Sequence, residues 1–385
     1  MMSKRFLSFA TALLTVMCLG SCTNEKTENI QQKTDNIEVN ETADAVDLVT
    51  DEVQEEVPEE AEQNEIAAEQ EPEQERIVYI NPLTGLETEK DLSTKRPITV
   101  MVNNLYEALP QIGISEADII YETLEEGGIT RLLCVYNNYS DIPEIGSVRS
   151  ARDYYIDIAD AHDAIFVHAG GSTYAYTALS ERRTNNIDGI YHNQFYRSAE
   201  RRKTMSKEHT LMISGNGIDD AIAYRGYRTT TEKPSPLTFS KDYAKGTTPA
   251  NHIEFAFSIG RTSKPYIKAF FDYNADSGEY LKGQFGMAHI DGDDNSQLSF
   301  KNVLTLTCPM NAIKGDALGC IQVHFTGTGR GTYAVDGTQR EIVWKKQSRT
   351  SSYTLYESDG ETPLMLSPGK SYIAIVPTGT EITLN

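Results

Sequence analysis

The chain has 385 residues and a net charge of −21, with 35 Lys and Arg against 56 Asp and Glu. The charge is uneven, because residues 1–21 carry +2 and residues 23–76 carry −16, which leaves only −7 for residues 77–385. No basic stripe of the kind that binds phosphate backbones is visible, so nucleic acid is not an expected partner.

The first 22 residues predict a bacterial lipoprotein signal. Two basic residues precede a largely apolar, uncharged run at 6–19, which is shorter than the ~20 residues that span a bilayer. The run ends in Leu19-Gly-Ser-Cys22, the pattern of a lipobox. We expect residues 1–21 to be removed and Cys22 to anchor the protein to the membrane through a diacylglyceryl group, whose two chains suffice for stable attachment. An ordinary signal peptide with a coincidental cysteine is the alternative.

Residues 22–76 predict the lipidated cysteine followed by an acidic, disordered tether. Residues 23–76 hold 19 Asp and Glu against three Lys and Arg, and no aromatic residue. Such a segment cannot bury enough apolar surface to offset its chain entropy. A flexible chain of this length spans roughly 40 Å. We therefore expect a folded body held away from the membrane on its extracytoplasmic face.

The residues after the tether exceed the size at which single cores usually stop growing, which predicts two domains. Residues 77–235 alternate strand-like and helix-like segments, which is typical of an α/β or α+β domain with a mixed sheet. Residues 236–385 show short strands and Gly-containing turns, which predicts a mainly-β domain.

The first domain begins with three buried strand patterns at 98–103, 117–123 and 129–136, the last two joined as a hairpin through Glu125-Glu-Gly-Gly128. A helix is expected over 150–162, a strand over 164–168, and a helix through Ser180 with Ser172 as its N-cap. A strand at 210–213 and a helix at 218–224 follow.

The second domain contains eight strand-like segments, at 252–258, 266–273, 280–288, 302–307, 321–326, 331–335, 339–345 and 371–376. Trp344, the only tryptophan, is expected in the core. Cys134 is expected to be a buried thiol in a strand. Cys308 and Cys320 either form a disulfide or remain separate, because the pairing depends on geometry that the sequence does not give.

Three loops that follow strands of the first domain form the candidate ligand site. They contain Asn103 and Asn104, the segment Gly146 to Arg152, and His168-Ala-Gly-Gly-Ser172. If the strands are parallel, their trailing loops meet at one edge of the sheet, where ligands bind in open α/β folds. Helix N-termini, the glycine pair Gly170-Gly171 before Ser172, and the arginines Arg149 and Arg152 suit an anion. The alternative is structural, with both arginines paired to acids such as Asp153 or Glu122.

Two further groups could join this site. Arg197 lies in a loop with Arg201, Arg202 and Lys203. His168 and His209 flank strands and are candidate general bases, although a structural histidine is the alternative for each.

No cofactor or metal site is expected. Asp291-Gly-Asp-Asp-Asn295 lacks the glycine and glutamate of a calcium loop, and Gly327-Thr-Gly-Arg-Gly331 lacks the Lys-Ser/Thr of a phosphate-binding loop. Neither a Gly-x-Ser-x-Gly nor a His-Glu-x-x-His motif occurs.

The chain resembles the YerB-like lipoproteins over residues 80–385. The resemblance is carried by segments 95–104, 117–122, 126–131, 145–152 and 167–172, and later by His289-Ile-Asp291, Trp344-Lys-Lys346 and Leu366-Ser-Pro-Gly369. It implies a bacterial envelope protein with paired N- and C-terminal domains of unknown function, and it brings no activity.

Three functional hypotheses follow. The first is an envelope lipoprotein whose α/β domain binds an anionic or peptide-like ligand, such as a cell-wall fragment. The second is an enzyme acting on the cell envelope with a histidine base, and the third is a scaffold that docks a protein. A space shared by His168, His209 and a carboxylate would favour the enzyme, whereas arginines paired with buried acids would favour the scaffold.

Overall fold

The computed structural model describes residues 77–258 and 267–385, all of which belong to one compact unit, Glu73–Asn385. The predicted signal peptide, Cys22 and the acidic tether lie outside the described residues. Among the helices of the described ranges, none combines the length and the apolar character that crossing a membrane requires.

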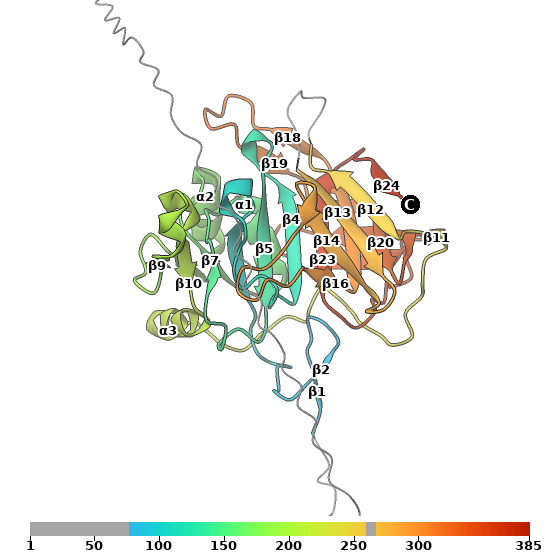
Figure 1. Ribbon diagram of the computed structural model, residues 1–385, viewed down its shortest axis with the longest axis horizontal. Helices are drawn as coiled ribbons and strands as arrows, with labels where there is room; N and C mark the ends of the chain where they lie inside the picture. The colour runs from blue at the N-terminus through green and yellow to red at the C-terminus, as the bar shows by residue number, and fades with distance from the viewer. Residues whose placement is uncertain (1–76, 259–266) are drawn as a thin grey trace, which may run out of the picture. The chain divides into compact units, whose positions relative to one another are not determined.

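A mixed eleven-stranded sheet runs through this unit (Figure 1). Its N-terminal strands are β3 (Ile98–Asn103), β4 (Ile119–Leu124), β5 (Thr130–Tyr136), β7 (Ile165–His168) and β8 (Asn186–Asp188). Its C-terminal strands are β11 (Thr248–Pro249), β17 (Asn302–Cys308), β20 (Gly327–Val335), β21 (Thr338–Lys346), β22 (Tyr353–Glu357) and β23 (Ser371–Pro377). The order is β11-β21-β20-β17-β23-β4-β5-β3-β7-β8, with β22 paired to β21.

The predicted hairpin of the first domain is confirmed. β4 and β5 pair antiparallel from Ile119↔Val135 to Leu124↔Thr130, around the short 3-10 helix η2 (Glu126–Gly128). Every residue of β3, β4 and β5 is buried, because both faces of these strands are covered. β3 pairs antiparallel with β5 and parallel with β7.

Three α-helices lie beside the N-terminal strands (green and teal in Figure 1). They are α1 (Asp153–Ala161), α2 (Thr173–Arg182) and α3 (Gly215–Arg225). The side chain of Ser172 accepts a hydrogen bond from the backbone N–H of Ala175 at 3.1 Å, so the predicted N-cap of α2 is confirmed. Ser214 caps α3 in the same way through Gly217.

A second sheet of six strands, on the right in Figure 1, forms most of the remaining C-terminal part. It contains β12 (His252–Ala256), β13 (Lys268–Asn274), β14 (Glu279–Gln284), β15 (Met287–Ala288), β16 (Ser299–Phe300) and β24 (Ile382–Leu384). The smaller sheets pair β1 (Tyr79–Ile80) with β2 (Glu87–Thr88), β18 (Met310–Ala312) with β19 (Ile321–Val323), and β10 (Leu211–Ile213) with β6 (Ile145–Gly146) and β9 (Tyr196–Arg197). The other 3-10 helices are η1 (Tyr106–Ala108), η3 (Arg201–Lys203) and η4 (Lys207–His209).

The two halves of the chain share the central sheet. β23, near the C-terminus, pairs in parallel with β4 from Ser371↔Ile119 to Ile375↔Thr123, and with β17 on its other side. The ring of Tyr372 in β23 packs on that of Phe271 in β13, with centroids 4.8 Å apart. The fold is therefore a mixed sheet with helices in the N-terminal half and a mainly-β C-terminal half, as predicted, and β23 joins them through one continuous core.

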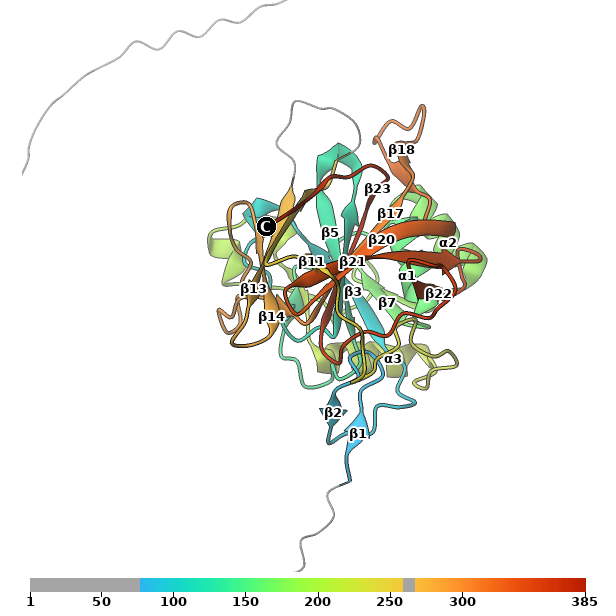
Figure 2. The ribbon, with the colours of Figure 1, turned by 90° about the vertical axis from the view of Figure 1, so that its right-hand side faces the viewer.

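The buried cysteines and the tryptophan occupy structural positions. Cys134, Cys308 and Cys320 are all free and buried, so the open question of a Cys308–Cys320 bridge is answered by two separate thiols. Trp344 in β21 is only 1% exposed and donates its indole N–H to the carbonyl of Thr307 at 3.0 Å. It is the core anchor that the sequence predicts. Figure 2 shows β20 and β21 crossing the centre of the unit, with the β18 hairpin extending away from it.

Candidate functional site

The candidate site lies at the carboxyl ends of β3, β7 and β8, which run parallel to one another. β5 departs from the expectation of parallel strands, because it is antiparallel to β3 and ends at the opposite edge. After β5, the segment Ser147–Arg152 brings the chain back to the edge formed by the carboxyl ends of β3 and β7. We call the edge formed by residues 103–104, 147–152 and 168–172 the rim.

Backbone hydrogen bonds insert Ser147–Arg152 between the ends of β3 and β7. The N–H of Asn103 donates to Ser147 and the N–H of Arg149 donates to Met101, both at 2.9 Å. On the other side, Ala169 donates to the carbonyl of Arg149 at 2.9 Å, and Ala151 donates to that of Gly170 at 2.8 Å. The structure thus brings Asn103, Arg149, Arg152 and His168–Ser172 together, although the side chains of these residues have different surroundings.

Gly170 allows the tight turn after β7. Its φ of +76° lies in the left-handed region, where a side chain would be strained. Its N–H donates to the Asp188 carboxylate at 2.8 Å, so the turn is held by β8. Gly171 and the N-cap Ser172 follow with ordinary backbone angles, and the turn leads directly into α2.

Two arginines, Arg152 of the rim and Arg131 near the start of β5, pair with acids at the β4–β5 turn. Arg131 Nε lies 3.0 Å from Glu125 Oε2, and Arg152 Nη2 lies 3.8 Å from the same oxygen. Arg152 also donates through Nε to Glu126 at 3.0 Å. The acids are not the expected Asp153 and Glu122, since Asp153 pairs with Arg349 and Glu122 with Lys282.

The carboxyl of Glu125 is the electrostatic centre of this cluster. Its side chain is 0% exposed. Burial, which disfavours the charged form, raises the pKa of Glu125 to about 7, and the nearby arginines Arg131 and Arg152 oppose that rise. A small change in these surroundings therefore alters the charge of Glu125 near neutral pH.

Arg149 is held less tightly than its neighbours. Its side chain is 20% exposed, and Nη1 lies 3.4 Å from Oε2 of Glu208, a side chain that is 58% exposed. The buried Nε has no hydrogen-bond partner among the described residues. Desolvation lowers the pKa of Arg149, followed by repulsion from Arg131. Arg149 is thus the rim cation that retains a free donor.

His209 and Arg197 lie beside Arg149 through η4. Asn103 donates its side-chain amide to Nδ1 of His209 at 2.8 Å, and burial lowers the pKa of His209. Nε2 of His209 lies 3.7 Å from Glu208, and Arg197 donates to the carbonyl of Lys207. His209 therefore joins the rim as a neutral imidazole that orients Asn103.

His168 is fully buried, and both of its ring nitrogens have partners. Nδ1 lies 2.8 Å from the carbonyl oxygen of Gly170, and Nε2 lies 3.2 Å from Oδ1 of Asn186. Its ring stacks on Phe166 with a centroid distance of 5.1 Å. These contacts fix the turn after β7 and do not present either nitrogen to solvent.

Asn104 points away from the rim into a buried polar network that joins the two halves. Its amide nitrogen donates to Glu122 at 3.0 Å and to Thr130 at 2.9 Å, and its Oδ1 accepts from Gln111 and Gln284. Glu122 also accepts from Thr130 and from Tyr372 of β23. Every member of this group is buried.

A buried lysine completes the network. Lys282 Nζ lies 3.6 Å from Glu122 Oε2, and both side chains are 0% exposed. The same Nζ donates to Nδ1 of His289 at 2.9 Å, and Nε2 of His289 lies 2.8 Å from Oε1 of Gln111. Burial lowers the pKa of Lys282, and burial followed by repulsion from Lys282 lowers the pKa of His289 well below its usual value. Neutral His289 thus accepts from the lysine and donates to Gln111.

Sequence reasoning missed this network, although one signal was present. Tyr280, Lys282 and Gln284 alternate with period two in β14, so all three share the inner face of the strand. A lysine in line with a buried tyrosine indicates a buried charge, which requires an acidic partner. The sequence does not say that the partner is Glu122, which lies 160 positions earlier.

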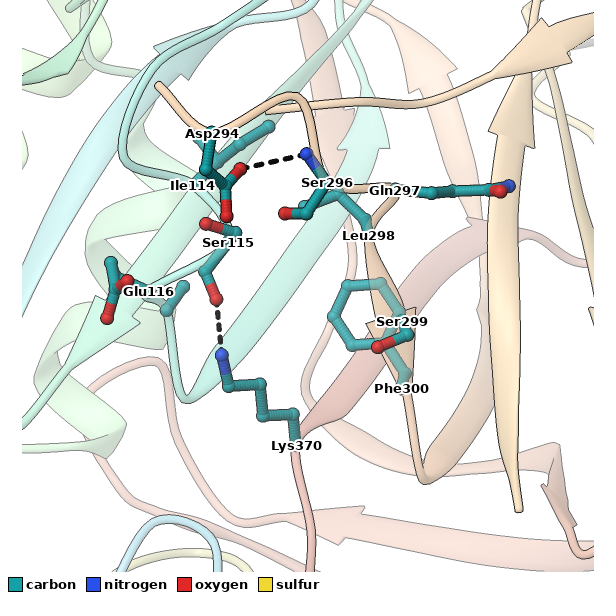
Figure 3. Close-up of a pocket in the computed structure, with 11 residues that line it drawn as sticks. Ile114, Ser115, Glu116, Asp294, Ser296, Gln297, Leu298, Ser299, Phe300 and Lys370 are labelled. Atoms are coloured by element: carbon teal, nitrogen blue, oxygen red, sulfur yellow. Dashed lines mark hydrogen bonds between the residues drawn. The ribbon is translucent and has the colours of Figure 1, made fainter. Parts of the chain in front are cut away.

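Two cavities lie near this network and not at the rim. A mainly apolar pocket of about 260 Å³ is lined by Tyr106 of η1, by Leu109 and Pro110, and by residues 287–290, which include His289. A polar pocket of about 230 Å³ lies between residues 114–117, residues 294–300 and Lys370. In Figure 3, Lys370 points to the carbonyl of Ser115 and Asp294 accepts from the N–H of Ser296. Neither cavity is lined by a residue predicted for the ligand site.

Within residues 77–258 and 267–385, no three His, Cys, Asp or Glu side chains gather closely enough to hold a metal ion.

The chain is similar to known proteins over most of its length. Residues 83–228 match the N-terminal domain, and residues 260–373 the C-terminal domain, of a family described as "Protein of unknown function (DUF3048)". A curated Bacillus subtilis (strain 168) protein named "Putative lipoprotein YerB" is 30% identical over 298 residues, which cover 77% of this chain and 86% of that protein. The crystal structure of the YerB protein from Bacillus subtilis superposes with a TM-score of 0.68 at 27% identity, covering 79% of this chain and 99% of that one.

Proposed function

We propose that this chain, which belongs to the DUF3048 family and carries its N- and C-terminal domains in order, is a lipoprotein that binds a ligand outside the cytoplasm. Cys22 anchors it to the membrane, and the rim of its α/β half takes an anionic or peptide-like ligand such as a cell-wall fragment. The lipobox at Cys22 and the name of the Bacillus subtilis relative support the anchor.

The ligand-binding part of the proposal rests on the side chain of Arg149. Arg131 and Arg152 are already paired with Glu125 and Glu126. Arg149 instead has an unpartnered Nε and a long contact to the exposed Glu208. The contact to Glu208 is long and Glu208 itself is exposed, so an incoming carboxylate or phosphate can replace the Glu208 carboxylate at small cost and accept a hydrogen bond from the guanidinium.

The scaffold hypothesis has one observation in its favour. Arg152 of the rim and the adjacent Arg131 are paired with the acids of the β4–β5 turn, one of which is fully buried, so neither arginine offers a free charge to a ligand. The enzyme hypothesis has less support, because His168 and His209 contact different partners and both are buried.

A binding experiment tests the proposal. The full chain, purified in detergent micelles, is titrated calorimetrically with a muropeptide mixture and, separately, with glucosamine 6-phosphate. Loss of a charged hydrogen-bond pair predicts that Arg149→Ala weakens binding by roughly tenfold or more. Binding of the wild type is also expected to fall as salt rises.

The control is Arg330→Ala, which removes an exposed arginine that pairs with Glu341 in the C-terminal half. This variant is expected to bind as the wild type does. Equal affinities of Arg149→Ala and the wild type for both probes would overturn the proposed site.

A further inference from the structure

An exposed aromatic surface lies next to the rim. We call it the tyrosine surface, and it consists of Tyr176, Ile190, Tyr191, His192 and Tyr224. Ile190, Tyr191 and Tyr224 are 62%, 78% and 80% exposed, and Tyr176 is 36% exposed. Large side chains exposed to this extent and gathered in one place mark a site of interaction.

The buried carboxylate of Asp188 links the turn after β7 to Tyr176 and Ile190 of the tyrosine surface. Oδ1 of Asp188 accepts from the N–H of Gly170 at 2.8 Å and from that of Ile190 at 3.0 Å. Its Oδ2 accepts from the hydroxyl of Tyr176 at 2.8 Å. Asp188 is only 4% exposed, so these three bonds are shielded from water. The turn after β7, α2 and the loop after β8 are therefore fixed relative to one another before any ligand binds.

The tyrosine surface borders the rim on one side and reaches the end of α3 on the other. A side chain placed at Gly170 would meet Ile190 on one side and the Ser150 hydroxyl on the other, so Ile190 lies close to the residue that follows Arg149. On the far side, the rings of His192 and Tyr224 are in edge contact with centroids 6.3 Å apart. The surface thus extends from the rim across the loop after β8 to the end of α3.

The size and chemistry of this surface fit a glycan. Standard protein interfaces involve roughly 20–30 residues on each side, far more than the five side chains here. Tyrosine rings have an electron-rich face that attracts the C–H groups on one face of a pyranose ring, while their hydroxyls can bond to sugar hydroxyls. The carboxylate of Asp188, which bonds to Tyr176 and Ile190 from below, is buried and so is shielded from a ligand on the surface.

We propose that the tyrosine surface binds a glycan strand whose pyranose rings stack on Tyr191 and Tyr224 while an acidic substituent reaches Arg149. This inference rests on the proposed function, because it assigns the ligand class of the same rim. The ligand site then consists of Arg149 and the adjacent tyrosine surface, along the carboxyl ends of β7 and β8.

The test compares a neutral and an acidic glycan on the full chain in detergent micelles. The probes are chitotetraose and a purified disaccharide-tetrapeptide muropeptide, and affinity is measured by calorimetry. Because one stacked ring is worth about 1 kcal/mol, or roughly fivefold in affinity, Tyr191→Ala and Tyr224→Ala are each expected to weaken binding of both probes by about that factor. Tyr191→Phe keeps the ring and should bind nearly as well as the wild type.

Tyr106→Ala is the matched control, because Tyr106 is 57% exposed but lies in η1, beside the apolar pocket. It should leave both affinities unchanged. Arg149→Ala should weaken the muropeptide and spare chitotetraose, which has no acidic group.

Three results would overturn the inference. One is unchanged muropeptide binding in Tyr191→Ala and Tyr224→Ala while Arg149→Ala loses it, in which case the proposed function stands and the glycan does not. Another is the absence of binding of either probe to the wild type. The third is a protein partner that is lost from the tyrosine variants when neither probe is affected.

Discussion

Replacing Lys282 with Met is expected to destabilise the protein strongly. Met has nearly the same length as Lys, so the change removes the charge and leaves the volume of the side chain almost unaltered. The removed ammonium contacts Glu122 at 3.6 Å, His289 at 2.9 Å and Gln284 at 3.2 Å. None of these three side chains can reach water to replace the lost contact, because all are buried.

The magnitude follows from the burial of the pair. Removing one partner of a buried ion pair usually costs about 3–5 kcal/mol, because the other charge stays buried without compensation. Glu122 keeps three donors after the substitution, from Asn104, Thr130 and Tyr372. We therefore expect a loss near the lower end of that range, about 3 kcal/mol of unfolding free energy. Adding Glu122→Gln to Lys282→Met should recover part of the loss, since no unpaired charge then remains.

Urea denaturation measures the effect with two probes. Trp344, the only tryptophan, reports on the C-terminal half by fluorescence, and far-ultraviolet circular dichroism reports on the whole chain. Coincident transitions would justify a two-state free energy. Lys268→Met is the matched control, because Lys268 is 60% exposed and pairs with Glu254 at 2.7 Å in the same six-stranded sheet. An exposed pair of this kind is worth less than about 1 kcal/mol.

The expected cost of an uncompensated buried carboxylate would be refuted if Lys282→Met lowered the unfolding free energy no more than Lys268→Met. It would also be refuted if the double variant with Glu122→Gln were less stable than Lys282→Met alone, because the cost would then not come from an uncompensated carboxylate.

Three further predictions concern the β4–β5 turn, α2 and the anchor. The pKa of Glu125 is raised in the folded state, so its contribution is complete below the unfolded pKa of about 4.5 and is lost as pH rises through about 7. The unfolding free energy of the wild type relative to Glu125→Gln should therefore fall between pH 5 and pH 7.5, and a difference independent of pH would contradict this. Ser172→Ala should lower stability by about 1 kcal/mol through loss of the cap on α2, measured by thermal unfolding against Ser277→Ala, an exposed serine whose hydroxyl caps no helix. Cys22→Ala should abolish lipidation and shift the protein from the membrane to the soluble fraction, checked by mass spectrometry and cell fractionation; retention in the membrane would show another anchor.

Local features of the N-terminal half could be predicted because each depends on residues close in sequence. The β4–β5 hairpin follows from two apolar runs separated by Glu125-Glu-Gly-Gly128, and the start of α2 follows from the capping hydroxyl of Ser172. The meeting of residues 103, 149–152 and 168–172 was also predicted, although β5 runs opposite to β3. These residues meet because β3 and β7 are parallel and the chain returns to their ends through Ser147–Arg152.

The sequence alone determined most of the longer strands and the three α-helices, since period-two and helical patterns and capping side chains act over a few residues. Only the tertiary structure decided that Glu125 would pair with both Arg131 and Arg152, that Glu122 would meet Lys282, and that β23 would lie against β4. Those pairings join segments up to about 250 positions apart. They are selected by burial and by the need of each buried charge for a partner, which no local pattern encodes.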